Sequence, residues 1–213
     1  MIGGQEMQYL LCALLGYCFG NINPAYIISK AKGFDIREFG TGNAGASNMA
    51  IIVGKKAGAF TALFDIAKAA LAAVIAGALF PQIAAAKIIG GCACILGHIY
   101  PVLMKFHGGK GLACIAGALL GYNPKLFLIL LVIEVAAALL LDYICVISIT
   151  GPVIFTLIYF FTTKEPVGTV CLAIVAVIMV SKHIVNLKKI KEGTETHISF
   201  LWKKKDKDKK DEE

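Results

Sequence analysis

Apolar residues in this chain come in seven runs, which are separated by short polar segments. Most runs approach the roughly 20 residues that an α-helix needs to cross the hydrocarbon core of a bilayer. The fourth run is about half that length. The runs cover residues 7–29, 57–80, 83–104, 112–122, 126–141, 144–161 and 167–180. The pattern therefore predicts an all-α integral membrane protein with seven transmembrane helices.

Composition favours a membrane protein over a soluble one. Of the 213 residues, 58% are hydrophobic and 16% are charged, whereas soluble domains are about half apolar and about a quarter charged. We expect one membrane domain over residues 1–196 and a charged tail over residues 197–213. The basic residues of the tail favour contact with anionic headgroups. Because no aromatic residues interleave with them, we expect no nucleic-acid partner.

The distribution of Lys and Arg predicts how the chain crosses the membrane. The alternate polar segments 30–56, 105–110 and the chain from residue 182 hold 17 of the 21 Lys and Arg residues. Cytoplasmic loops carry an excess of these residues, so this set is predicted to be cytoplasmic. The N-terminus then lies outside and the C-terminus lies in the cytoplasm, as seven spans require.

A few polar residues interrupt the apolar runs. Asn23 and Pro24 are expected to open the first helix, which leaves backbone groups that must face protein or a wet cavity. Asp65 and Lys68 are three residues apart and share one helical face. We interpret them as an ion pair that fixes helix packing, and a supporting role at a substrate site is the alternative. Glu134 has no evident partner in the sequence.

A glycine-rich turn precedes the fourth apolar run and consists of Gly108, Gly109, Lys110 and Gly111. Glycine lets backbone N–H groups approach an anion, a helix N-terminus favours negative charge, and the lysine adds a full positive charge. The spacing is not that of a Walker A loop. A tight cytoplasmic turn is the alternative, but the neighbouring His98 and Lys105 favour an anion site.

A second glycine-rich loop covers residues 40–48 and reads GTGNAGASN. Its hydroxyl, amide and backbone groups can donate hydrogen bonds to a phosphate or to a developing oxyanion. A polar surface loop is the alternative interpretation. The candidate substrate-binding residues in this loop are Thr41, Gly42, Asn43, Gly45 and Asn48.

The four histidines differ in their surroundings. His98 lies near the end of the third run, where a structural role and a catalytic role both fit. His183 lies three residues before Asn186, so the two side chains share one face of a helix that leaves the membrane. His107 and His197 lack such company, and we interpret them as surface residues.

No set of His, Cys and carboxylate residues has the spacing of metal ligands, so we expect no bound metal. The seven cysteines lie almost all in apolar runs, and no CxxC pair is present. They fit the role of small buried hydrophobic residues.

Three stretches in order read GTGNAGASN, GHIYPVLMKFHGGKG and KHIVNLKKIKEGTE. Together they resemble the bacterial acyl-phosphate:glycerol-3-phosphate acyltransferase family, whose patterns are GSGNxGATN, GHxFPxFLxFKGGKG and RHxxNIxRLxxGxE. The resemblance covers nearly the whole chain to about residue 196. It implies a multi-pass protein of the bacterial plasma membrane with seven spans and an active site that faces the cytoplasm.

The resemblance also implies transfer of a fatty acyl group from acyl phosphate to the 1-hydroxyl of glycerol 3-phosphate, without a cofactor. By matching position, Thr41, Lys110, His183 and Asn186 would hold the glycerol phosphate, and His98 would shape or polarise the site. Whether His183 is a base or only a donor is open. The expected partners are the two substrates and membrane lipid, with the chain a monomer or a weak oligomer.

The chain departs from the family pattern at positions that bear on anion binding. Ile51 replaces an Arg of the first motif, and Asp142 and Cys145 replace an Arg and a Ser of a later one. These changes weaken an anion site, and Arg37 or Lys55 is hypothesised to compensate. Two alternatives follow: a divergent relative that acts on another phosphorylated acceptor, and a transporter of phosphorylated solutes.

Overall fold

The computed structural model describes residues 3–201, and these residues form helices and loops without a strand. The α-helices are α1 (Gly4–Asn21), α2 (Pro24–Ala31), α3 (Ala46–Ile52), α4 (Lys55–Leu79), α5 (Ala86–Ile99), α6 (Leu112–Tyr122), α7 (Pro124–Leu141), α8 (Cys145–Thr163) and α9 (Pro166–Lys191). The 3-10 helices are η1 (Ile36–Glu38), η2 (Val102–Met104) and η3 (Ile198–Leu201). The all-helical prediction is confirmed for these residues. Most of the predicted charged tail lies outside them.

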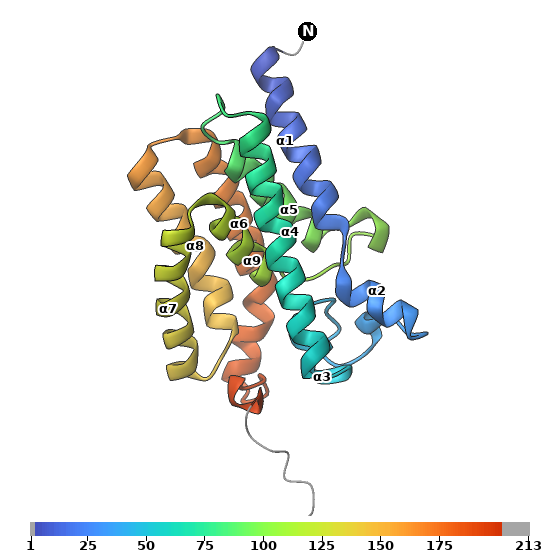
Figure 1. The fold of residues 1–213 in the computed structure, drawn as a ribbon. Coiled ribbons are helices and arrows are strands. Elements are labelled where there is room, and N and C mark those ends of the chain that lie inside the picture. Colours follow the sequence, from blue (N-terminus) through green and yellow to red (C-terminus); the bar gives the residue numbers. More distant parts are fainter. Residues whose placement is uncertain (1–2, 202–213) are drawn as a thin grey trace, which may run out of the picture.

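Six segments of the described chain are long and apolar enough to cross a membrane. They are Gly4–Ala31, Lys55–Leu79, Ala86–Met104, Pro124–Leu141, Cys145–Thr163 and Pro166–Lys191. The fourth predicted span is α6, which has 11 residues and extends over about half of a hydrocarbon core. The connection from α6 to α7 turns back before the end of the bundle where the α4–α5 and α8–α9 connections lie (Figure 1).

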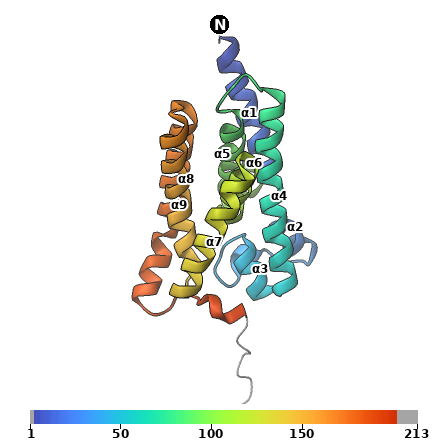
Figure 2. The ribbon, with the colours of Figure 1, turned by 60° about the vertical axis from the view of Figure 1, so that its left-hand side comes forward.

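The helices form two groups that α7 joins (Figure 2). One group contains α1, α4, α5 and α6, and the other contains the pair α8 and α9. Glycines let α1 and α5 approach closely, since a Cβ on Gly16 would overlap the carbonyl of Gly90 and a Cβ on Gly20 would overlap that of Cys94. Lipid provides no hydrophobic driving force for helix association, so close packing of small residues stabilises the contact between α1 and α5.

The predicted break in the first apolar run is present between α1 and α2. The ammonium group of Lys68 on α4 donates hydrogen bonds to the freed carbonyls of Gly20 and Ile22, at 3.3 and 2.6 Å. It also lies 2.6 Å from Oδ1 of Asp65, and both side chains are buried. The ion pair is confirmed, and the opened backbone faces protein, so its carbonyls are satisfied within the bundle.

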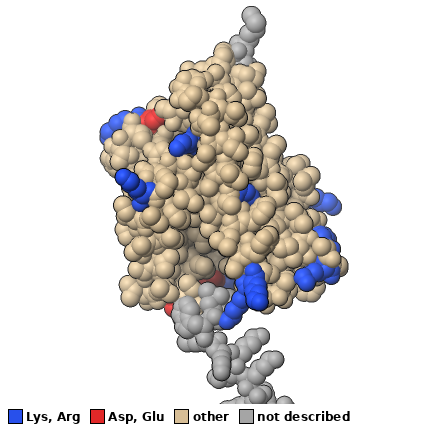
Figure 3. All heavy atoms as spheres, in the orientation of Figure 1, with Lys and Arg blue, Asp and Glu red and all other residues tan. Residues whose placement is uncertain are grey.

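The three motif stretches gather at one end of the bundle. α2, α3 and the C-terminal end of α9 lie at the end opposite the N-terminus (Figure 1). On the face drawn in Figure 3, a group of Lys and Arg side chains lies over the region of α2 and α3. This end therefore combines glycine-rich loops with positive charge.

Candidate functional site

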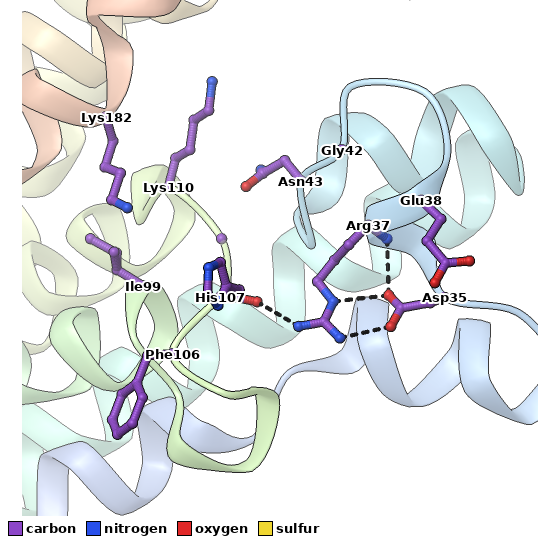
Figure 4. A pocket seen from close by; sticks show the side chains of 12 residues that line it. Asp35, Arg37, Glu38, Gly42, Asn43, Ile99, Phe106, His107, Lys110 and Lys182 are labelled. Atoms are coloured by element: carbon purple, nitrogen blue, oxygen red, sulfur yellow. Dashed lines mark hydrogen bonds and ion pairs between the residues drawn. The ribbon is translucent and has the colours of Figure 1, made fainter.

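A hollow of about 460 Å³ lies between the segment 35–43, the segment 106–110 and the part of α9 that carries Lys182. Its wall combines three cationic side chains with two carboxylates and several glycines. The lining residues are Asp35, Arg37, Glu38, Gly42, Asn43, Ile99, Phe106, His107, Gly108, Gly109, Lys110 and Lys182. Asn43 reaches from the first loop toward the turn that carries Lys110 (Figure 4). The first two motifs and the third therefore meet at one cavity.

The two glycines before Lys110 are fixed to the end of α5. The N–H groups of Gly108 and Gly109 donate to the carbonyls of Ile99 and His98, each at 3.0 Å. A Cβ on Gly109 would overlap Nε2 of His98. These two N–H groups are therefore already hydrogen-bonded within the protein and do not bind an anion. The glycines instead allow the turn to pack closely against the ring of His98.

Lys110 is half-buried, and its ammonium group donates a short hydrogen bond to Oδ1 of Asn186. The amide of Asn186 in turn donates to Oε1 of Glu195 at 2.7 Å. Burial lowers the pKa of Lys110 from its ordinary value, although the nearby Glu195 carboxylate opposes this shift. Lys110 and Asn186, predicted from different motifs, are thus in direct contact, and Glu195 is a third member that the sequence interpretation did not single out.

His183 is buried on α9, one turn before Asn186, at a position where the Lys110 charge acts on its ring. Its Nδ1 lies 2.8 Å from the carbonyl oxygen of Met179. Because a carbonyl only accepts hydrogen bonds, Nδ1 carries the hydrogen in this contact and Nε2 of the neutral ring keeps a lone pair. The geometry leaves Nε2 able to accept a proton or a hydrogen bond.

The loop 40–48 is held from inside by Asn48. This side chain is fully buried, donates to the carbonyls of Ile36 and Phe39 at 3.0 Å each, and accepts the N–H of Thr41 at 2.9 Å. Its amide is therefore used within the loop and does not face the hollow. Thr41 is exposed at the tip of the loop, and Gly45 is the buried N-cap of α3.

Arg37 and Asp35 form a clamp that the sequence interpretation did not find. The guanidinium group donates to both carboxylate oxygens of Asp35, at 2.9 and 2.7 Å, and to the carbonyls of Met104 and His107, at 2.8 and 3.2 Å (Figure 4). These hydrogen bonds from Arg37 hold the pKa of Asp35 well below its usual range. The Asp-x-Arg spacing just before the glycine-rich loop was the available signal. His107, interpreted as a surface residue, lines the hollow.

His98 lies beneath the hollow rather than on its wall. It is 3% exposed, and its Nδ1 lies 3.2 Å from the ammonium nitrogen of Lys68 and 3.4 Å from Oδ1 of Asp65. Ligand-type atoms of Asp65, His98 and Cys114 lie within 4.8 Å of one another. The ammonium group of Lys68 contacts two of these three side chains, those of Asp65 and His98. A lysine side chain therefore supplies the positive charge that a metal ion would bring to this cluster.

The residues that depart from the family pattern lie in three settings. Ile51 is exposed on α3, and Cys145 is buried at the start of α8. Asp142 accepts hydrogen bonds from the N–H and the hydroxyl of Ser199, at 2.8 and 3.0 Å, and its Oδ2 lies 3.1 Å from Nδ1 of His197. Burial opposes ionisation of Asp142, but the Ser199 hydrogen bonds prevail and lower its pKa. Asp142 thus fastens the chain after α9.

Long apolar helices with a cation-lined hollow at one end define a multi-pass membrane protein with a candidate anion-binding site. Residues 10–193 match the glycerol-3-phosphate acyltransferase family. The chain belongs to this family.

Relatives and a solved structure agree with this assignment. A glycerol-3-phosphate acyltransferase of Macrococcus caseolyticus is 39% identical over 202 residues, which cover 91% of this chain and 99% of the relative. One from Thermoanaerobacter sp. strain X514 is 37% identical over 196 residues, covering 90% and 96%. The chain is also similar to the crystal structure of PlsY (YgiH), an integral membrane glycerol 3-phosphate acyltransferase in its glycerol 3-phosphate form, with a TM-score of 0.81, 29% identity and coverage of 92% and 99%.

Proposed function

We propose that this protein transfers a fatty acyl group from acyl phosphate to the 1-hydroxyl of glycerol 3-phosphate, which yields lysophosphatidate and inorganic phosphate. The observation that carries the proposal is the contact of Lys110 with Asn186 at the cation-lined hollow of a chain that belongs to this acyltransferase family. Lys110 supplies the positive charge that an anionic acceptor needs, and Asn186 fixes where that charge lies.

The reaction needs positioning more than a strong nucleophile. An acyl phosphate is a mixed anhydride, so the substrate hydroxyl can attack its carbonyl carbon directly and phosphate leaves as the C–O bond to it breaks. The hydroxyl proton passes to Nε2 of His183 or to a phosphate oxygen of the substrate. Lys110 stabilises the negative charge that develops near the carbonyl oxygen and on the leaving phosphate.

The proposed residue roles follow from these contacts. Lys110, His183 and Asn186 contact the reacting groups, with Thr41, Gly42 and Asn43 supplying hydrogen bonds from the facing loop. His98, Asn48 and Gly45 act as positioning residues. They are buried and hold the two glycine-rich loops in place without facing the substrate. Gly108, Gly109 and Gly111 shape the turn, and Gly111 has a φ of +91° that favours glycine.

The proposal includes a membrane topology. Seven segments cross or enter the membrane, with α6 as a half-length member, the N-terminus outside and the C-terminus in the cytoplasm. The excess of Lys and Arg at the motif end supports a site that faces the cytoplasm of a bacterial plasma membrane. Residues 1–196 form the catalytic domain and residues 197–213 a charged tail, and the protein acts as a monomer or a weak oligomer.

One observation supports a second candidate acceptor. Ile51 stands where the family pattern has an Arg, and Arg37, hypothesised to compensate, spends most of its donors on Asp35 and on backbone carbonyls. A divergent enzyme that prefers another phosphorylated polyol would fit a site with fewer available cations. Lys55 stays as a hypothesis for the compensating charge.

Phosphate release by the purified protein in lipid tests the proposal. With acyl phosphate present, addition of glycerol 3-phosphate should start release of inorganic phosphate and formation of lysophosphatidate in equal amounts. Release with a different phosphorylated polyol, but not with glycerol 3-phosphate, would favour the divergent acceptor. Absence of release with every acceptor, from protein that stays folded, would overturn the assignment as an enzyme.

A further inference from the structure

Glu134 is a buried carboxyl group in the middle of an apolar helix, and the proposed mechanism does not use it. It lies on α7 and is 5% exposed. The hydroxyl of Thr150 on α8 lies 2.7 Å from its Oε2 and also 2.9 Å from the carbonyl of Val146. A hydroxyl has one hydrogen, so Thr150 can fully satisfy only one of these two acceptors.

The second oxygen of Glu134 has no hydrogen-bond partner among the described residues. A buried polar atom without a partner is costly, and within a membrane segment the cost is higher because lipid offers no substitute. Gly151 leaves space beside this atom, since a Cβ at that position would stand 3.8 Å from Oε1 at ordinary contact distance. The oxygen is therefore buried, unpaired and next to room for another group.

The room beside Oε1 is part of a narrow groove between α6, α7 and α8. Apart from Glu134 and Gly151, the groove is lined by apolar side chains: Leu112, Ile115, Ala116, Leu119, Phe127, Leu130, Leu131, Val135, Ile147 and Phe155. An aliphatic chain is compatible with such a lining, because apart from Glu134 the side chains that line it are apolar and leave no polar group to desolvate.

The groove begins close to Lys110 along the chain. Its first lining residue on α6, Leu112, lies two residues after Lys110 in the chain, and the lining extends along α6 to Leu119. With a rise of about 1.5 Å per residue, that wall is roughly 10 Å long. A donor whose phosphate lies at Lys110 would have its acyl chain close to the start of this wall.

We propose that this groove receives the acyl chain of the acyl donor and that Glu134 selects chains that carry a hydroxyl group at the depth of Oε1. The proposal rests on the proposed acyl transfer and adds a specificity-determining residue to it. A hydroxyl donates to the unpaired oxygen, whereas an unsubstituted chain buries that oxygen without a partner. The difference in hydrogen bonding then appears as a preference between chains of equal length.

Competition between acyl phosphates tests this inference. Purified protein in lipid is given glycerol 3-phosphate with one of a series of monohydroxylated acyl phosphates, which differ only in hydroxyl position, or with the unsubstituted acyl phosphate of equal length. We expect the wild type to prefer one positional isomer, with kcat/KM about fivefold above that of the unsubstituted chain, as one net hydrogen bond predicts. Glu134→Leu should reverse the preference, and Glu134→Gln, which keeps an acceptor oxygen, should retain part of it.

Control measurements separate the possible failures. Ile133→Leu changes a neighbouring lipid-exposed position of α7 and should keep both the rate and the preference of the wild type. Binding is measured independently as the rise in melting temperature caused by lysophosphatidates with and without the hydroxyl. Normal turnover of the unsubstituted chain without any preferred isomer, or an equal preference in Glu134→Leu, would overturn the role of Glu134. Failure of the wild type to turn over any acyl phosphate would instead overturn the proposed function.

Discussion

At the scale of single residues, Lys110 illustrates how burial and charge combine. The side chain is half-buried, which disfavours its ammonium form, yet Asn186 and Glu195 hold that form in place. A lysine in this setting carries a positive charge that is poorly solvated in the absence of substrate. In the proposed site, an anionic substrate would pair with this charge, so substrate binding and protonation of Lys110 would be coupled.

Replacing Lys110 by Ala should remove this charge and lower the rate of acyl transfer by about 100-fold or more, as loss of one key donor does in other active sites. The rate of lysophosphatidate formation is the measurement, with the melting temperature as a check on folding. Lys105→Ala is the matched control, because Lys105 is an exposed lysine of the same loop that does not line the hollow. Transfer at near wild-type rates by a folded Lys110→Ala variant would refute the site assignment.

The lowered pKa of Lys110 predicts a pH dependence of substrate affinity. As pH rises, the Lys110 ammonium group loses its proton at a lower pH than an exposed lysine does. The pKa of an exposed lysine is about 10.4. The KM for glycerol 3-phosphate should therefore rise on the alkaline side in the wild type, by up to about tenfold per pH unit beyond that pKa. Lys110→Arg keeps its charge over this range, so its KM profile should be flatter. Identical profiles for the two proteins would contradict the assignment.

The lowered pKa of Lys110 also affects stability, and this effect changes with pH in the opposite direction to substrate affinity. The folded state holds the Lys110 proton less tightly than the unfolded state does, because burial disfavours the charged form. Between the two pKa values the unfolded chain binds more protons, so this residue's contribution to the free energy of unfolding increases with pH. Affinity for substrate and the Lys110 contribution to stability therefore change in opposite directions on the alkaline side.

At the scale of elements, the end of α5 supports the Lys110 turn. The carbonyls of His98 and Ile99 accept the N–H groups of Gly109 and Gly108, and the imidazole lies against Gly109. Asp65 and Lys68 hold the other side of that imidazole. The position of Lys110 thus depends on a stack that reaches from the opened end of α1 through α4 to the glycine turn.

Gly109→Ala tests this support. The added Cβ would overlap Nε2 of His98, so the turn or the ring must shift, and overpacking of this kind typically costs about 1–3 kcal/mol. We expect a lower melting temperature and a higher KM for glycerol 3-phosphate. Gly4→Ala is the control, since a Cβ there meets no atom within 4 Å, and it should change stability by about 0.5 kcal/mol or less. A Gly109→Ala variant with unchanged KM and stability would rule out the close packing.

Some features of the elements follow from local sequence, and others depend on how the chain folds. The break at Asn23 and Pro24 followed from local chemistry and was predicted. The inward position of Asn48 was not predicted, because a motif does not show which nearby backbone groups its amide will bind once the loop folds. The hydrogen bonds from Arg37 to the carbonyls of Met104 and His107 were not predicted either, because they join segments 67 and 70 residues apart in the chain. A motif gives the residue types of a site, but it does not say which polar groups are already used.

At the scale of the whole molecule, the distribution of Lys and Arg predicts sidedness. In the proposed topology, Lys105 lies in the cytoplasmic loop after α5, and Lys164 lies in the outer connection between α8 and α9. A membrane-impermeant maleimide applied to intact cells should label Lys164→Cys and leave Lys105→Cys unlabelled, with the exposed Cys18 changed to Ser in both. Labelling of the Lys105→Cys protein alone would reverse the proposed orientation.

The sequence by itself determined that the chain is helical, where its apolar segments lie and which three stretches carry polar chemistry. Lipid enforces these features locally, because a spanning segment must be apolar, must satisfy its own backbone and must reach a fixed length. Only the tertiary structure decided that Lys110 meets Asn186, that His98 supports the site from beneath and that Glu134 faces a groove with one oxygen unpaired. Those relations depend on how distant helices pack, and hydropathy along a chain does not encode the distance between two side chains.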